Sequence, residues 1–350
     1  MQPRPAMVAR FGLAVALLAG VLGAPAAESA TPVRIAGMGV SPVRSTPLAA
    51  ATDFERMRAA GLDTVMFDVW ADVPTWTTSV IYPGARTSSD AELLAGITLA
   101  KSAGLRVIVV PKLWCPTCTH TWRGFISPSD PGTFFTVYKL WVNRYAELAQ
   151  QAGAWAFYFG SEMHRTERYA GLWRSVASEV RARFRGPVVY DAGWDRVFEL
   201  PFWDASSFIS VSAYFPLSDA ALPSVSELRR CWRSSCAAKY ARVRWFDKLR
   251  ALSRRTGKRV LFGEAGYTST LYNTQRPYDE NAGGRASQQA QANAYLALLQ
   301  TFQREPWWMG AIWWEWNIAA NPQVNRDYTP RDKAAESLLR RWYVLGWRGY

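Results

Sequence analysis

The sequence predicts an α/β fold, a (β/α)8 TIM barrel that forms a single domain after a signal peptide. Short apolar runs and longer helical stretches alternate eight times along the 350 residues, and glycine or proline marks most changes between them. Eight parallel strands with crossover helices close into a barrel that has no edge to protect. An open doubly wound sheet would require a Gly-rich phosphate loop after the first strand, and none follows it.

The first 26 residues have the features of a secretory signal peptide. Arg4 and Arg10 precede an apolar segment from Phe11 to Leu22, and small residues at 24–26 supply a cleavage site. The apolar segment is too short to span a bilayer, and no later segment approaches that length. We therefore expect a secreted or periplasmic protein without stable membrane insertion, with its folded domain over residues 31–350.

The strands and helices can be assigned in order. Each predicted strand is a short apolar run bounded by turn residues, and helices end at glycines such as Gly61, Gly104 and Gly153. The helix between the fifth and sixth strands is poorly defined, and residues 214–235 form a long insert. The predicted strands are 33–37, 64–68, 106–111, 155–159, 187–190, 208–213, 260–262 and 310–316, and the predicted helices are 52–60, 88–103, 132–152, 165–184, 237–256, 288–304 and 331–343.

The chain is basic and contains four cysteines. Its formal net charge is +13, but the basic residues are spread along helical stretches such as 174–185 and 242–259, so we expect a solvated surface and no nucleic-acid partner. In an exported protein the cysteines favour disulfides over a zinc site. Pairing within each short segment is the simplest of three connectivities. The candidates are Cys115 with Cys118 and Cys231 with Cys236.

Two predicted strands end in a similar pattern, with a glycine shortly before a glutamate. Residues 155–159 lead into Gly160-Ser161-Glu162, and residues 260–262 lead into Gly263-Glu264. Catalytic groups of such barrels come from the C-terminal ends of strands. A lone glutamate there could be a packing or capping residue, but a pair suits glycoside hydrolysis. In that reaction one carboxyl protonates the leaving oxygen and the other attacks the anomeric carbon.

Other side chains at strand ends complete the candidate site. Tyr214 follows strand six, where the sequence suits equally a packed aromatic residue and a donor of a hydrogen bond to an ionised Glu264. Trp314 lies at the end of strand eight, where its flat indole offers a stacking surface for a sugar ring, and Trp70 and Trp114 are further candidates for sugar contacts. Glu315 is expected to point away from the face that Trp314 and Trp316 share, because side chains alternate along a strand.

Other reaction classes have little support in the sequence. His120 and His164 are the only histidines, so a serine or cysteine nucleophile has few possible bases. Neither the GxSxG nor the HExxH motif occurs. We expect neither a metal nor an organic cofactor.

The motifs together resemble glycoside hydrolase family 113 of clan A over essentially the whole mature chain. The chain departs from the family pattern at Ser161, where clan members commonly have asparagine, and after strand three, where Lys-Pro-His is absent. The matching segments are Gly160-Ser161-Glu162, Leu261–Tyr267, Trp313-Trp314-Glu315-Trp316, Trp122–Ile126 with Ser129-Asp130, Phe202-Trp203-Asp204 and Ser212–Leu217.

The resemblance implies a (β/α)8 barrel and retaining hydrolysis, with Glu162 as the acid/base, Glu264 as the nucleophile and Trp314 flooring the sugar subsite. The family's characterised members act on β-1,4-mannan. We therefore expect a monomeric, endo-acting mannanase, or a relative acting on another extracellular β-linked polysaccharide or oligosaccharide. A catalytically silent carbohydrate-binding barrel is the alternative. A structural or polyanion-binding protein at the cell surface would rest on the basic charge alone.

Overall fold

The computed structural model describes residues 1–2, 34–40, 47–317 and 326–347. The folded unit comprises Val33–Tyr350. Almost all of the predicted signal peptide lies outside the described residues. None of the helices in the described ranges is long and apolar enough to cross a membrane.

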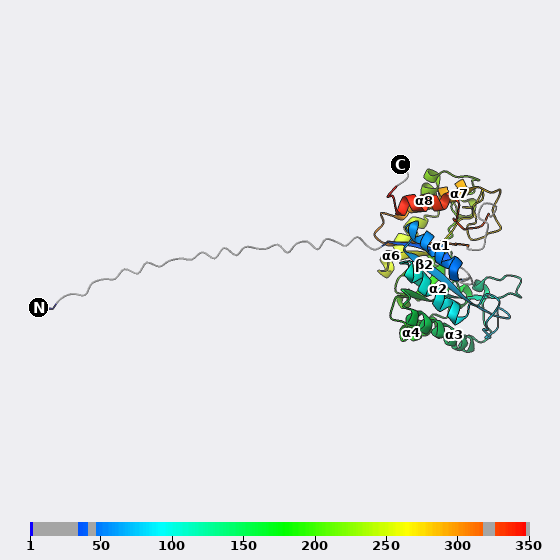
Figure 1. The fold of residues 1–350 in the computed structure, drawn as a ribbon, viewed down its shortest axis with the longest axis vertical. Helices are drawn as coiled ribbons and strands as arrows, with labels where there is room; N and C mark the ends of the chain where they lie inside the picture. The colour runs from blue at the N-terminus through cyan, green and yellow to red at the C-terminus, as the bar shows by residue number, and fades with distance from the viewer. Residues whose placement is uncertain (3–33, 41–46, 318–325, 348–350) are drawn as a thin grey trace. The chain divides into compact units, whose positions relative to one another are not determined.

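Eight parallel strands form a closed barrel in the order in which they occur along the chain, which confirms the predicted fold (Figure 1). Pairing of the first strand with the last closes the barrel. The strands are β1 (Ile35–Val40), β2 (Thr64–Asp72), β3 (Arg106–Trp114), β4 (Ala156–Ser161), β5 (Val188–Gly193), β6 (Ile209–Ser212), β7 (Val260–Ala265) and β8 (Trp308–Trp313).

Helices follow most of the strands, and local sequence explains where several begin and end. Ser89 caps α2 with Glu92 in a reciprocal capping box. Gly153 and Gly257 adopt left-handed conformations that end α3 and α6. The helices are α1 (Pro47–Ala59), α2 (Asp90–Ser102), α3 (Pro131–Ala152), α4 (Ala170–Arg181), α5 (Val225–Arg233), α6 (Trp245–Thr256), α7 (Gln288–Phe302) and α8 (Ala334–Tyr343).

Three features between β5 and β7 bear on the sequence-based assignment. The connection from β5 to β6 contains only a 3-10 helix, η3 (Trp203–Ala205), which accounts for the weak helical signal there. The insert after β6 holds helix α5, which Ser224 caps. Helix α6 begins at Trp245 rather than at 237, because residues 238–240 form the short helix η4.

The barrel interior is a packed layer of apolar side chains. Its buried members come from all the strands except β6, together with Phe208 just before it, and fill the space that the strands enclose. Polar side chains begin above this layer, towards the C-terminal ends of the strands, where Asp68, Lys112 and Asp191 are also buried. The interior cluster comprises Ile35, Met66, Ile108, Val110, Ala156, Tyr158, Val189, Phe208, Leu261 and Ile312.

Both predicted cysteine pairs form disulfides. Cys115 bonds to Cys118 directly after β3, and Cys231 bonds to Cys236 at the end of α5. Each bond closes a loop of only a few residues. The disulfides therefore shape two loops and do not link distant parts of the chain.

Candidate active site

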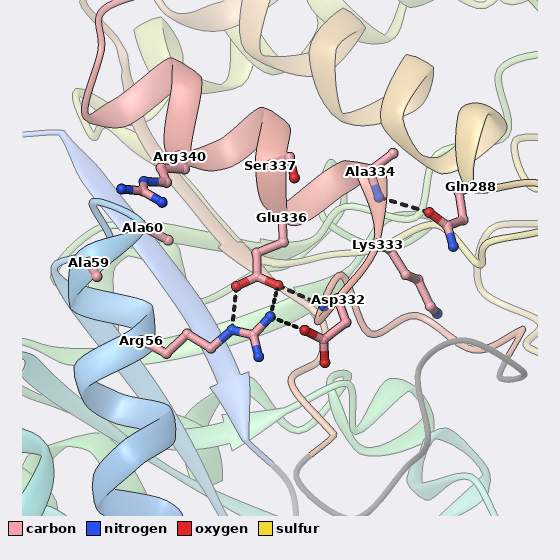
Figure 2. A pocket seen from close by; sticks show the side chains of 10 residues that line it. All are labelled: Arg56, Ala59, Ala60, Gln288, Asp332, Lys333, Ala334, Glu336, Ser337 and Arg340. Carbon is pink, nitrogen blue, oxygen red and sulfur yellow. Dashed lines mark hydrogen bonds and ion pairs between the residues drawn. The ribbon is translucent and has the colours of Figure 1, made fainter.

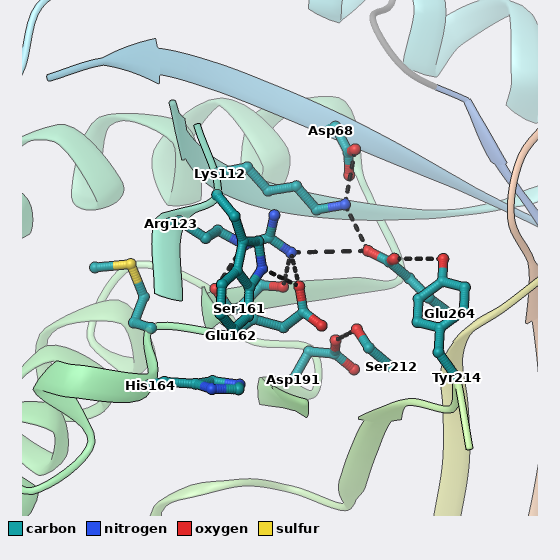
Figure 3. Close-up of polar contacts among 12 residues, drawn as sticks. Asp68, Lys112, Arg123, Ser161, Glu162, His164, Asp191, Ser212, Tyr214 and Glu264 are labelled. Atoms are coloured by element: carbon teal, nitrogen blue, oxygen red, sulfur yellow. Dashed lines mark hydrogen bonds and ion pairs between the residues drawn. The ribbon is translucent and has the colours of Figure 1, made fainter. Parts of the chain in front are cut away.

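Glu162 and Glu264 converge at the C-terminal ends of β4 and β7 (Figure 3). Glu162 directly follows β4, and Glu264 lies within β7. Arg123 Nη2 is 2.7 Å from Glu162 Oε2 and 4.0 Å from Glu264 Oε1. The two carboxylates therefore surround one guanidinium nitrogen, although only 8% and 5% of these residues' surfaces are exposed.

A shift in strand pairing sets the direction of Glu264. Val211 of β6 pairs with Phe262, and the next residue, Ser212, pairs with Glu264, so Gly263 is an extra residue in β7. An extra residue bends a strand and shifts the alternation of its side chains. The shift allows Glu264 to face the polar end of the barrel.

Lys112 on β3 joins Glu264 to a second carboxylate. Its Nζ donates hydrogen bonds to Glu264 Oε1 at 2.6 Å and to Asp68 Oδ2 at 2.8 Å. Burial disfavours the charged amine, yet the charges of Asp68 and Glu264 together raise the pKa of Lys112. Burial raises the pKa of Asp68 to about 6, and Lys112 opposes that shift. One buried cation therefore organises two buried anions.

Arg123 plays the corresponding part for Glu162. Its Nε and Nη2 donate to the backbone oxygen and the hydroxyl of Ser161, and Nη2 also donates to Glu162 Oε2. Trp122 Nε1 donates to the same Oε2 at 3.1 Å, and this indole is 36% exposed. The 3-10 helix η1 (Arg123–Phe125) thus places a guanidinium and an indole against the first glutamate.

A fourth carboxylate, Asp191 on β5, lies below the two glutamates in Figure 3. Ser210 and Ser212 donate to its two oxygens at 2.5 and 2.6 Å. Burial, followed by the charge of Glu264, raises the pKa of Asp191 to about 7. A Cβ on Gly263 would lie 2.4 Å from Asp191 Oδ1, so a glycine is required beside this carboxylate.

Tyr214, shortly after β6, and Trp314, directly after β8, flank Glu264. The Tyr214 hydroxyl donates to Glu264 Oε2 at 2.9 Å. Lys112 Nζ lies 4.1 Å from the centroid of the Trp314 ring, so this indole borders the same ion-pair cluster. The peptide bond between Trp314 and Glu315 is cis.

Trp70 and Trp114 lie farther along the same edge of the barrel. Their rings meet edge to face at 6.0 Å, and Lys112 Nζ is 5.8 Å from the centroid of Trp70. The exposed Arg86 guanidinium lies 3.9 Å from the centroid of Trp114 and 5.4 Å from that of Trp70. One face of Trp114 therefore carries an arginine where the sequence suggested a surface open to sugar.

The prediction for Glu315 assumed that strand eight continues beyond this residue. Strand β8 ends at Trp313, so the alternation of side chains along a strand does not apply to Glu315. Burial raises the pKa of Glu315 to about 8, with further contributions from the nearby charges of Asp68 and Glu264. Glu315 is therefore within electrostatic range of the site.

His164 also lies near the site. Its ring meets the indole of Trp122 edge to face at 4.5 Å. Burial lowers the pKa of His164 to about 4, so the imidazole is neutral at physiological pH. In the described part of the chain, no group of three or more His, Cys, Asp or Glu side chains is arranged to hold a metal.

Sequence reasoning missed the roles of Lys112, Arg123 and Trp122. Lys112 directly follows the apolar residues 107–111, and a cation at the end of such a buried run is a signal for a buried anion. Arg123 and Trp122 lie in the segment 122–126, which resembles the family, but nothing local assigns them to Glu162. Their role depends on the path of the loop between β3 and α3.

A hollow of about 950 Å³ lies between α1 and α8 and shares no lining residue with the glutamate site (Figure 2). Arg56 crosses it and pairs with Glu336 and Asp332. The charges of Arg56, Asp332 and Glu336 therefore satisfy one another.

Comparison with known proteins agrees with this geometry. The model for glycoside hydrolase family 113 matches residues 44–333. A search of curated proteins found no match. A solved complex of a β-1,4-mannanase of family 113 superposes with a TM-score of 0.77 at 25% identity, covering 89% of this chain and 99% of that chain.

Two further structures define how far the similarity extends. The family 113 β-mannanase from Alicyclobacillus acidocaldarius has a TM-score of 0.76 and 26% identity, over 89% of this chain and 97% of that one. A fungal β-1,4-galactanase has a TM-score of 0.57 and 17% identity, over 88% and 99%, and shows only the shared fold. Because the family model covers most of the folded unit, the chain belongs to glycoside hydrolase family 113 and is a glycoside hydrolase.

Proposed function

We propose that this protein is an endo-acting β-1,4-mannanase that retains anomeric configuration, with Glu162 as acid/base and Glu264 as nucleophile. The observation that carries the proposal is the meeting of both carboxylates at Arg123 Nη2. The proposed substrate is that of the family 113 structures to which the chain is similar along their whole length.

The spacing of the carboxylates supports retention. Since Arg123 Nη2 is 2.7 Å from one oxygen and 4.0 Å from the other, Glu162 Oε2 and Glu264 Oε1 are at most about 7 Å apart. Retaining enzymes hold their carboxyl groups about 5–5.5 Å apart, and inverting enzymes about 6.5–9.5 Å. This limit on one oxygen pair includes the retaining distance, so the geometry is compatible with retention.

In the first step a Glu264 oxygen bonds to the anomeric carbon while the glycosidic bond breaks. Lys112 and Tyr214 each donate to the Glu264 carboxylate and hold it in position for this attack. The proton for the departing oxygen comes from Glu162. Both donors to Glu162 bond Oε2, and within the described chain Oε1 accepts no hydrogen bond, so Oε1 is the oxygen suited to carry that proton.

In the second step Glu162 takes a proton from water, and the resulting hydroxide bonds to the anomeric carbon as the bond to Glu264 breaks. The product keeps the configuration of the substrate, because two inversions have occurred. Trp314 would support the sugar ring beside Glu264, and Trp70 would border a neighbouring sugar.

Cleavage of soluble β-mannan tests the proposal. Wild type is expected to release new reducing ends, and NMR of the first product should show the β anomer. Glu264→Ala should lose at least about 1,000-fold in kcat, because no nucleophile remains. Glu179→Ala is the matched control, since Glu179 is a partly exposed glutamate paired with Lys139 on the outer helices.

Two outcomes would contradict the proposal. Binding of mannan without new reducing ends would favour a carbohydrate-binding barrel, and release of the α anomer would exclude retention. Cleavage of another β-glycan but not of mannan would leave the mechanism in place and reject the substrate.

We also propose export and a monomeric state. The signal-peptide pattern in residues 1–26 supports export, as do the two disulfides, which persist in oxidising compartments. N-terminal sequencing of protein recovered from an exporting host should find the start near residue 27. Light scattering should give the mass of one chain.

A further inference from the structure

The turn that carries Glu162 has an unusual backbone and two anchors on β5. Glu162 has a φ of 49°, in the left-handed region that few residues other than glycine adopt. Its N–H donates to the backbone oxygen of Asp191 at 2.8 Å. The next N–H, of Met163, donates to the side-chain hydroxyl of Tyr190 at 3.0 Å. Side-chain chemistry on β5 therefore helps to hold this turn.

The hydroxyl of Tyr190 is itself fixed by a buried carboxylate. It donates to Glu167 Oε1 at 3.1 Å, and Glu167 is only 1% exposed. The other Glu167 oxygen faces Arg196 Nε at 3.6 Å. Because the hydroxyl proton points to Glu167, its lone pair is turned to the Met163 N–H. The hydrogen bonds thus form a chain with one direction, from Met163 through Tyr190 to Glu167.

The ring of Tyr190 is held as firmly as its hydroxyl. Its centroid lies 5.0 Å from that of Trp173 and 4.9 Å from that of Phe202. A Cβ on Gly160 would lie 2.8 Å from Tyr190 Cε2, so the glycine two residues before Glu162 is what lets this ring approach β4. These contacts fix the ring of Tyr190 and therefore the place of its hydroxyl group.

We propose that Tyr190 and Glu167 are positioning residues for Glu162. The inference rests on the proposed function, in which Glu162 protonates the leaving oxygen. Left-handed backbone is disfavoured outside glycine, so it persists only where surrounding contacts hold it. General acid catalysis requires the carboxyl within hydrogen-bond reach of the leaving oxygen, and a displacement of about 1 Å can cost about 100-fold in rate.

The test compares two substrates in Tyr190→Phe. A manno-oligosaccharide has a poor leaving group and needs the acid, whereas 2,4-dinitrophenyl β-mannobioside releases a phenolate that needs no proton. We expect kcat/KM of the variant to fall about 10- to 100-fold on mannohexaose and less than about threefold on the aryl glycoside. A general loss of structure would lower both values equally.

Tyr138→Phe is the matched control. Tyr138 is also fully buried and also donates its hydroxyl to the β4 segment, at Phe159 O, 3.1 Å away. It packs against Trp173, as Tyr190 does. Its bond precedes the turn, however, so Tyr138→Phe should lower the thermal midpoint about as much while leaving the ratio of the two kcat/KM values at the wild-type level.

A second pair of variants covers the case in which Tyr190→Phe folds poorly. Glu167→Gln keeps an oxygen that can accept from Tyr190, and it should stay within about threefold of wild type on mannohexaose. Glu167→Ala removes that acceptor, and it should lose activity selectively on mannohexaose. We expect activity on mannohexaose to be preserved by glutamine and lost with alanine only if the hydrogen bond from Tyr190 to residue 167 positions Glu162.

Equal losses on both substrates, or a Tyr190→Phe ratio equal to that of Tyr138→Phe, would overturn the inference. Equal activity of the two Glu167 variants on mannohexaose would overturn the part assigned to that carboxylate. If wild type cleaved neither substrate, the proposed function would fail. If wild type cleaved both and only these comparisons failed, the proposed function would stand without this inference.

Discussion

Two buried cations hold the carboxylates of the site at the scale of single residues. Lys112 joins Asp68 and Glu264, and Arg123 joins Glu162 and approaches Glu264. Removing one partner of a buried pair leaves an unpaired charge in a poorly solvated place, which costs more than the pair contributes. The site's order therefore depends on residues that do not take part in bond making.

Lys112→Met tests that dependence. Because Asp68 and Glu264 would lose their shared donor, we expect a loss of about 3–5 kcal/mol in the free energy of unfolding and at least about 100-fold in kcat. Urea denaturation and kinetics on soluble mannan measure the two effects. Lys139→Met is the control, because its pair with Glu179 is partly exposed and should contribute about 0–1 kcal/mol. Equal costs for both variants would contradict this account.

Asp191 predicts a pH dependence of stability. Burial raises its pKa from 3.8 to about 7, so the folded protein binds a proton that the unfolded chain releases. The resulting stabilisation is fully present below the unfolded pKa and is lost as pH rises through about 7. Asp191→Asn does not titrate. The stability advantage of wild type over this variant should therefore shrink from about pH 4 to about pH 8.

Urea midpoints at intervals across that range check the prediction. An advantage that stays constant or grows with pH would show that Asp191 is not protonated in the folded protein. Asp204→Asn provides a comparison, because Arg174 holds the pKa of this exposed carboxyl below its usual value. The stability advantage of wild type over Asp204→Asn should instead grow as pH rises from the acidic side.

At the scale of elements, irregular strand pairing directs both glutamates. The pairing of β4 with β5 shifts between Tyr158 and Gly160, and the pairing of β6 with β7 skips Gly263. Bulges of this kind re-aim side chains next to active sites. Gly160 and Gly263 have a packing role at these shifts, because a Cβ on Gly160 would meet Trp173 and Tyr190 and a Cβ on Gly263 would meet Ser210 and Asp191.

Gly263→Ala should disturb the site through packing. The new Cβ would lie 2.1 Å from Ser210 Oγ and 2.4 Å from Asp191 Oδ1, so these groups or the strand must move. We expect a loss of about 1–3 kcal/mol in stability and a clear fall in kcat. Gly171→Ala is the control, since nothing lies within 4 Å of its Cβ on helix α4, and it should be neutral or stabilise by up to about 1 kcal/mol. Thermal melts and kinetics distinguish the two variants, and a neutral Gly263→Ala would refute the packing argument.

At the scale of the whole molecule, stability comes from the closed barrel and its helical layer. The two disulfides close loops of sequence separation 3 and 5, and no cysteine is free. Cross-links of short loops remove little entropy from the unfolded chain, about 2 kcal/mol each or less. The barrel should therefore survive their reduction.

Reduction under native conditions tests this expectation. Far-ultraviolet circular dichroism should be unchanged, and the thermal midpoint should fall by several degrees without loss of the cooperative transition. The double variant Cys231→Ala with Cys236→Ala should behave like the reduced protein at α5. Loss of the folded signal on reduction would show that the disulfides are required for the barrel.

The sequence by itself determined the order of strands and helices, because apolar runs and turn residues are local features that report burial directly. It also identified Glu162 and Glu264 as a pair, since parallel strands in a barrel present their C-terminal ends on one face. The absence of a clear helical pattern between β5 and β6 is also a local feature, and the structure has only the short 3-10 helix η3 there.

Tertiary structure alone decided how the glutamates are held. The contacts of Lys112, Arg123 and Tyr190 join segments far apart in the chain, and no local pattern encodes which buried cation meets which carboxylate. The direction of Glu264 depends on a one-residue shift between neighbouring strands, which changes every side chain beyond it. The local amino-acid composition determines where a strand forms. The register between strands and the pairing of buried charges are determined only when the barrel closes.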